Sequence, residues 1–259
     1  MKDHSTARRQ RGEVTLKDLE PFRQLTDGGL LGLLSDPDPR TRAAAARLLG
    51  DRRSAEAVNT LCERLAAEKA LYARLAAGEA LAAIGLPALP GLISLLGKIG
   101  SNQYRAVPDT GFFKKSYPLP RDLAARVIIR MGEAALPALE EVIRQGQRDS
   151  VLEAVDAIGH IAFYSKNTRS QGVLLDLYCR SDGDELTRWK LVRAFQSYPA
   201  AGVRELLVEI IQHDPNPVMR CDALRSLALH GQGVSESIRA AIRCDSDPEM
   251  QKVAGFFLK

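Results

Sequence analysis

The chain has 259 residues, of which 45% are hydrophobic and 26% are charged, a composition typical of a folded globular protein rather than a disordered one. Its net charge is +4, but residues 1–11 and 100–121 each carry a net charge of +3, so the remainder carries −2. This distribution excludes a continuous basic groove along the body of the protein. No apolar run approaches the roughly 18 residues of a membrane helix, and none follows the basic N-terminus, so we expect a cytoplasmic protein.

The N-terminal region begins with a polar segment. Residues 1–14 are predicted to be a disordered basic tail, followed by a short capping helix, Thr15–Leu25, with Thr15 as its N-cap. From residue 15 to residue 259 we expect a single domain. Gly29–Leu34 begins its regular part, and the turn Ser35–Pro39 leads to its first complete helix.

One helical pattern recurs along the rest of the chain. In Ala70–Gly85, the anchor Arg74 is followed at helical spacing by Ala77, Leu81, Ile84 and a terminal glycine. The anchor positions of the same pattern are 42, 74, 121, 148, 188, 220 and 251, and several steps are 31 or 32 residues long. This period is typical of a repeat of two helices, which bury their apolar faces only when neighbouring repeats stack.

The turns before these helices carry acidic and capping residues at fixed positions. An acid lies six residues before several anchors, at Asp36, Glu68, Asp182, Asp214 and Asp245. Residues that favour the N-cap lie four before the anchor, at Asp38, Asp184, Asn216 and Asp247. Tight turns between helices are therefore predicted by cap chemistry as well as by periodicity.

An acid six residues before an arginine, followed by a helix of small and aliphatic residues, resembles the HEAT repeat. The ALPAL openings and the compact period resemble the phycobilisome-lyase-like, short HEAT branch. The resemblance covers residues 28–259 and implies an all-α fold, a right-handed α-solenoid or superhelix of about seven HEAT-like helical hairpins.

The resemblance also implies a structural ladder between turn acids and helix arginines. Lys115 and Val142 occupy the acid position of the third and fourth repeats, which predicts an interruption there. The implied pairs are Asp36 with Arg42, Glu68 with Arg74, Asp182 with Arg188, and Asp214 with Arg220.

A charged row lies on the opposite face of the second helices, five residues after each anchor. The row is explained either by a solvated face of mixed charge or by a binding stripe on the concave surface. In a binding stripe, the planar guanidinium groups of the arginines would suit carboxylates or phosphates. The row consists of Arg47, Glu79, Arg126, Glu153, Arg193 and Arg225, flanked by Arg130, Lys190 and Asp222.

A loop insertion at residues 99–120 interrupts the third repeat and concentrates aromatic and basic side chains. Long loops in compact arrays are usually functional or disordered, and exposed aromatics beside arginines are typical of interfaces. Packing of the aromatics back onto the solenoid, binding of a protein, and binding of a nucleic acid or another anion all remain open. The side chains concerned are Tyr104, Arg105, Phe112, Phe113, Lys114, Lys115 and Tyr117.

These features favour a non-catalytic scaffold or adaptor that binds another protein through its concave helix face and the insertion. The alternative is an anion or nucleic-acid binding module that uses the insertion, and a bilin-lyase-like or DNA-glycosylase-like enzyme is a minor alternative. No cofactor, metal site or catalytic residue is predicted. The predicted partner-binding residues are Tyr104, Arg105, Phe112, Phe113, Lys114, Lys115, Tyr117, Arg126, Arg130, Arg193 and Arg225.

Overall fold

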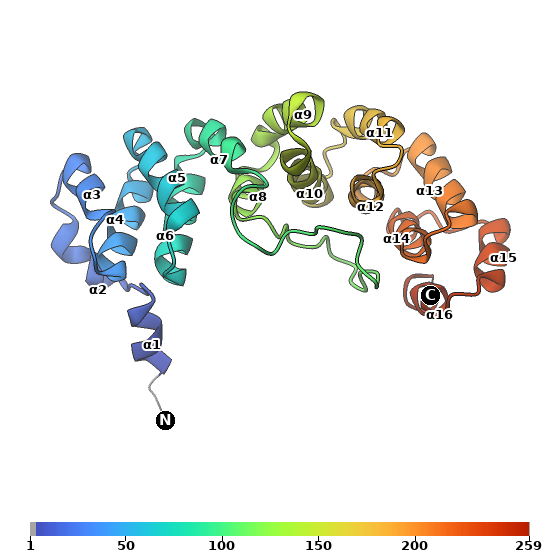
Figure 1. Cartoon of the computed structure of the whole chain (residues 1–259), viewed down its shortest axis with the longest axis horizontal. Coiled ribbons are helices and arrows are strands. Elements are labelled where there is room, and N and C mark those ends of the chain that lie inside the picture. Colours follow the sequence, from blue (N-terminus) through green and yellow to red (C-terminus); the bar gives the residue numbers. More distant parts are fainter. Residues whose placement is uncertain (1–3, 259) are drawn as a thin grey trace. The chain divides into compact units, whose positions relative to one another are not determined.

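The structure is a computed structural model that describes residues 4–258, with side chains from residue 6 onward (Figure 1). Packing divides the chain into two compact units. Unit 1 comprises the residues up to 101 together with 122–135, and unit 2 comprises 102–121 together with the residues from 136 onward. The single domain expected over residues 15–259 stays a prediction.

All regular elements in the described residues are helices, so the predicted all-α repeat fold is confirmed. Unit 1 contains α1 (His4–Gln10), α2 (Leu16–Leu19), η1 (Glu20–Phe22), α3 (Asp27–Leu33), α4 (Pro39–Asp51), η2 (Ala55–Ala57), α5 (Val58–Ala67), α6 (Leu71–Ile84), η3 (Leu86–Ala88), α7 (Leu89–Leu95), α8 (Leu123–Ile128) and η4 (Ile129–Ala135). Unit 2 contains α9 (Leu136–Gln145), α10 (Arg148–Ser165), α11 (Gln171–Arg180), α12 (Glu185–Ala194), η5 (Phe195–Ser197), α13 (Ala201–His213), α14 (Pro217–Ala228), α15 (Glu236–Cys244) and α16 (Pro248–Phe257).

Within each unit the helices pair as hairpins, and the second helices of neighbouring hairpins pack side by side. In unit 1 this layer consists of α4, α6 and α8, and in unit 2 it consists of α10, α12, α14 and α16. First helices also meet their neighbours, as α5 meets α7 and α9 meets α11. The charged row predicted on the second helices therefore lies on one layer in each unit.

Small residues allow the second helices to approach closely. A Cβ added to Gly50 at the end of α4 would lie 2.6 Å from the Ala80 Cα of α6, so alanine does not fit there. Leu49 and Leu81 are fully buried beside this contact. Gly85 has a φ of 81° and ends α6, because few residues with a side chain tolerate that conformation.

The predicted N-caps are confirmed where the acid or amide lies four residues before the anchor. Asp38 accepts a hydrogen bond from the Arg40 backbone N–H at 2.9 Å, and Asn216 accepts one from Val218 N–H at 2.9 Å. Each cap satisfies a donor that the first turn of the helix leaves without an intrahelical partner.

The structure places the ladder one repeat away from the predicted pairing. Arg42 donates to the Glu68 carboxylate of the next repeat, from Nε at 2.6 Å and from Nη2 at 2.9 Å. Its Nη1 donates to the Asp36 main-chain carbonyl at 2.7 Å, so Asp36 contributes a carbonyl oxygen rather than its carboxylate. Arg220 repeats the arrangement with the Asp245 carboxylate at 2.8 and 3.0 Å and the Asp214 carbonyl at 2.9 Å.

The remaining predicted pairs differ for identifiable reasons. Glu68 binds Arg42 and the Ala70 N–H, which leaves it no free role as the partner of Arg74. Arg188 donates to Tyr178 Oη at 2.7 Å and lies over that ring instead of binding the exposed Asp182. When each arginine binds the next repeat, its carboxylate partner has to lie in the turn of that next repeat. Pairing each arginine with the acid of its own repeat, as the family resemblance implies, overlooks this requirement.

The segment expected to be a disordered tail is helical over α1, although residues 1–3 lie outside the described part of the chain. Arg9 binds the Asp18 carboxylate at 2.7 and 3.2 Å, and Tyr72 N–H donates to the Arg11 carbonyl at 2.9 Å. The bidentate contact from Arg9 and the Thr15 donors together hold the pKa of Asp18 far below its ordinary value. These contacts fix the N-terminal segment against unit 1.

Candidate functional site

The second-helix face of unit 1 keeps its charged side chains accessible. We call the surface formed by Arg47, Leu75, Glu79, Arg126 and Arg130 the unit 1 face. Glu79, Arg126 and Arg130 are exposed, and Arg47 is half-buried. Leu75 is 50% exposed, which is high for a leucine, although Ala73 and Ala76 on the same helix are buried.

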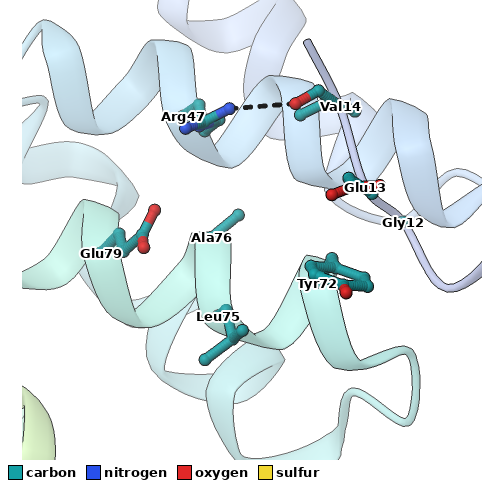
Figure 2. Close-up of a pocket in the computed structure, with 8 residues that line it drawn as sticks. All are labelled: Gly12, Glu13, Val14, Arg47, Tyr72, Leu75, Ala76 and Glu79. Carbon is teal, nitrogen blue, oxygen red and sulfur yellow. Dashed lines mark hydrogen bonds between the residues drawn. The ribbon is translucent and has the colours of Figure 1, made fainter. Parts of the chain in front are cut away.

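A hollow of about 260 Å³ lies at one end of this face, between α4, α6 and the segment that follows α1 (Figure 2). Arg47 closes it on the α4 side by donating to the Val14 carbonyl at 3.2 Å. Tyr72, Leu75 and Glu79 line the opposite side on α6. An apolar floor between opposite charges is the usual chemistry of a contact for one side chain of a partner.

In unit 2 the corresponding row is buried, contrary to the predicted binding stripe. Arg193 and Arg225 are only 3% and 1% exposed, and Lys190, Glu153 and Asp222 are also buried. The cause is the insertion, whose residues 102–120 extend over α10, α12 and α14 (Figure 1). A sequence periodicity identifies the face of a helix, but not whether a distant loop lies across it.

Arg225 is the main polar attachment point of the insertion. Its guanidinium donates to the carbonyl oxygens of Lys114, at 3.0 and 3.1 Å, and of Ser116, at 3.0 Å. Gln196 Oε1 provides a further acceptor at 2.9 Å. Burial lowers the pKa of Arg225 to about 10, and the group remains charged at neutral pH. It serves the chain's own loop rather than a partner.

Asp222 connects the insertion to α12. Its carboxylate accepts from the Trp189 indole N–H at 2.7 Å and from the Phe112 backbone N–H at 3.5 Å. Burial raises the pKa of this carboxyl group, against the attraction of Arg193 and Arg225. Trp189 therefore provides a buried hydrogen-bond donor.

Lys190 forms a buried ionic cluster beneath the insertion. Its Nζ lies 2.8 Å from Glu153 Oε1, 2.9 Å from Asp156 Oδ2 and 3.1 Å from the Leu152 carbonyl. Burial acts to lower the pKa of Lys190, but the carboxylates of Asp156 and Glu153 outweigh it and raise the pKa. All three ammonium protons have acceptors, as a buried lysine requires.

Three of the four aromatic side chains singled out in the insertion contact unit 2. Tyr104 meets Trp189 edge to face at 4.8 Å between ring centroids, and Phe112 lies 5.0 Å from the Arg225 guanidinium carbon. Tyr117 is 3% exposed and lies against Gly159 of α10. Phe113 is half-buried. The structure thus favours packing onto the helices for Tyr104, Phe112 and Tyr117.

The basic side chains of the insertion lie at its surface. Lys114 and Lys115 are exposed, and Arg105 forms an exposed ion pair with Asp149 at 3.5 Å. Arg121 at the end of the insertion stacks on Tyr104 with 3.7 Å between its guanidinium carbon and the ring centroid. Arg105, Lys114 and Lys115, which were predicted to bind a partner, are thus exposed, and so is Arg121, which was not.

Sequence reasoning did not identify Asp156, Gln196, Tyr72 or Leu75 as parts of these surfaces. Asp156 lies three residues after Glu153 on α10, so i,i+3 spacing was an available signal. The others depend on segments distant in sequence. Within the described part of the chain, no three His, Cys, Asp or Glu side chains lie close enough together to hold a metal ion.

The family model described as HEAT repeats matches residues 29–106, which confirms the HEAT resemblance over that part of the chain. Among solved structures, the chain is similar to the complex of CpcE and CpcF of phycocyanin lyase from Nostoc sp. PCC7120. The identity is 19%, the alignment covers 89% of this chain and 95% of that chain, and the TM-score is 0.33, a value that carries no argument about function. No match is found among curated proteins.

In the described residues, no single helix has the length and apolar character needed to cross a membrane. Leu71–Ile84 and Leu86–Leu95 taken together have the length and apolar composition of a membrane-spanning segment, but a bend of 118° separates the two helices.

Proposed function

We propose that this HEAT-repeat protein is a non-catalytic module that binds an extended segment of a partner protein on the unit 1 face. The observation that carries the proposal is the insertion in unit 2. There an extended stretch of chain, residues 102–120, lies across the second helices and is bound by its main-chain carbonyls and its aromatic rings. The repeats of this protein are thus suited to hold an extended peptide on that layer.

The chemistry of the unit 1 face defines the occupant. Leu75 and the hollow between Arg47 and Glu79 suit one large apolar side chain. Arg126 and Arg130, spaced by one helical turn and both exposed, suit acidic side chains of the same segment. The expected partner segment therefore combines an apolar anchor with nearby carboxylates.

In unit 2 the proposal keeps the exposed part of the predicted site and omits the buried part. Arg105, Lys114 and Lys115 are exposed and remain available to a partner, and Phe113 is half-buried beside them. Tyr104, Phe112, Tyr117, Arg193 and Arg225 are assigned to holding the insertion, because each is in contact with the insertion or is part of it.

A random peptide library selected against the full chain tests this function. Enriched peptides should contain an apolar residue beside acidic residues. Leu75→Ser should weaken their binding by about tenfold, because an anchor leucine contributes about 1.5 kcal/mol or more. Leu86→Ser is the matched control, since Leu86 is a 52% exposed leucine of unit 1 that does not line the hollow.

Equal binding to wild type, Leu75→Ser and Leu86→Ser would contradict the proposal, and so would a selection without acidic peptides. The anion or nucleic-acid alternative uses Arg105, Lys114 and Lys115. It would appear as binding of a single-stranded oligonucleotide that falls steeply with salt and is lost in Lys114→Ala/Lys115→Ala. Peptide binding anchored by Leu75 should change less with salt.

A further inference from the structure

A second cavity lies in unit 2, between the insertion and helices α10 and α12, and none of the residues assigned to partner binding in unit 1 lines it. Its volume is about 410 Å³. The insertion contributes the rings of Tyr104, Phe112 and Tyr117 to its wall, and the helices contribute Asp156 and Arg193. The wall therefore combines three aromatic rings with charged groups.

Arg193 is the unusual member of this wall. It is 3% exposed, and its guanidinium carbon lies 4.3 Å from the Trp189 ring centroid and 5.6 Å from that of Tyr104. Among the described residues, no hydrogen-bond acceptor reaches its buried Nε or Nη1. A guanidinium keeps its charge at all ordinary pH values, and a buried donor without an acceptor is costly.

The neighbouring carboxylates are already bound to other groups. Asp156 accepts from Lys190 at 2.9 Å, and Asp222 accepts from the Trp189 indole at 2.7 Å. Asp156 Oδ1 and Tyr117 Oη also face this region without hydrogen-bond partners among the described residues. Attraction from both carboxylates stabilises the charge of Arg193, but among the described residues Nε and Nη1 of Arg193 remain without an acceptor.

The rim of the cavity adds further positive charge. Lys114 and Arg121 line it and are both exposed. The lining therefore carries three basic groups and one carboxylate, and that carboxylate is paired with Lys190. A cavity with this balance attracts anions, and its aromatic wall favours an anion with a flat apolar body.

We propose that this cavity is a binding site for a small aromatic anion. The carboxylate or phosphate of the ligand accepts hydrogen bonds from Arg193, while its ring lies against Tyr104, Phe112 and Tyr117. A planar guanidinium is well matched to either head group. The site is independent of the partner surface proposed for unit 1.

The single tryptophan of the chain, Trp189, provides a direct readout because it stacks on Arg193. The intact protein is titrated with benzoate, phenyl phosphate and the neutral analogue benzamide while Trp189 fluorescence is recorded. Benzoate or phenyl phosphate should give a saturable change, and the tighter of the two identifies the preferred head group. Benzamide should bind at least about tenfold more weakly, because it lacks the charge that Arg193 recognises.

Arg193→Met retains the length of the side chain and removes the donors. It should weaken anion binding by about tenfold or more. Arg239→Met, a change of an exposed arginine on α15, is the matched control and should bind as wild type does. Equal affinity for benzamide and the anions would overturn the proposal without any variant. An unchanged anion affinity in folded Arg193→Met, or no saturable response to either anion, would also overturn it.

Discussion

Gly159→Ala tests whether the insertion is seated on α10. A methyl group at this position would lie 2.0 Å from Tyr117 Oη, 2.6 Å from Tyr117 Cζ and 3.0 Å from the Ala194 Cβ. Both Tyr117 distances are far shorter than a van der Waals contact, so the ring has to leave its place. The backbone of α10 is regular at Gly159, and alanine introduces no strain of its own.

The expected cost follows from the burial of Tyr117, which is 3% exposed. An aromatic side chain buries about 150–250 Å², and at about 25 cal/mol per Å² its release costs about 4–6 kcal/mol. Alanine stabilises the helix over glycine by about 1 kcal/mol. Hydration of the unpaired Tyr117 hydroxyl recovers about 1–3 kcal/mol. We therefore expect the free energy of unfolding to fall by about 2 kcal/mol.

Urea unfolding followed by Trp189 fluorescence measures this change, and trypsin cleavage after Lys114 and Lys115 reports release of the insertion. Gly255→Ala is the matched control, because Gly255 is an exposed glycine of α16 with no atom within 4 Å of an added Cβ. The control should gain up to about 1 kcal/mol. If Gly159→Ala is as stable and as resistant to trypsin as the control, Tyr117 does not lie against Gly159.

Three further predictions concern single contacts. Arg42→Ala should destabilise unit 1 by about 2 kcal/mol in urea unfolding, whereas Arg74→Ala should cost about 1 kcal/mol or less, and equal costs would refute the cross-repeat ladder. The Arg148 hydrogen bonds lower the pKa of Asp184 to about 2. This pair therefore stabilises the fold at pH values above the ordinary carboxyl pKa, and its contribution is lost as the pH falls toward 2. Arg148→Met should cost about 1 kcal/mol at pH 7, after allowance for exposure of the arginine, and much less near pH 2, so a loss independent of pH would contradict the pairing. Burial lowers the pKa of His230, so protonation favours the unfolded state and stability should fall as pH drops below about 6.5. His230→Gln should reduce that slope in melting curves recorded between pH 8 and pH 5, and an unchanged slope would exclude His230 as its source.

The repeat architecture was predictable because it depends on local chemistry. Asp38 caps α4 and Gly85 ends α6 as the sequence predicts, since each acts within a few residues of its own position. The pairing of Arg42 was not predictable in detail. The six-residue spacing in the sequence identifies an acid in the turn before Arg42. Only the stacking of neighbouring repeats decides whether Asp36 or Glu68 provides the carboxylate that Arg42 binds.

The same distinction between local contacts and contacts of distant segments applies to the candidate site. The charged row was found from its helical spacing, and its exposure in unit 1 agrees with that analysis at Glu79 and Arg126. In unit 2 the row lies beneath a segment about 110 residues away in sequence, as the hydrogen bonds from Arg225 to Lys114 show. No pattern within α14 carries that information, because the insertion can be positioned only by its own contacts.

Equivalent positions on the second helices thus have opposite environments, and the buried ones differ in how fully their donors are satisfied. Lys190 has two carboxylates and a carbonyl, and Arg225 has three carbonyl or amide oxygens. Arg193 is enclosed by the same insertion, yet it is held between rings without an acceptor for Nε or Nη1. Among the described residues Arg225 Nη1 also lacks an acceptor, but Arg193 lacks one at both Nε and Nη1 and lines a cavity, where an acceptor from outside the chain could reach it.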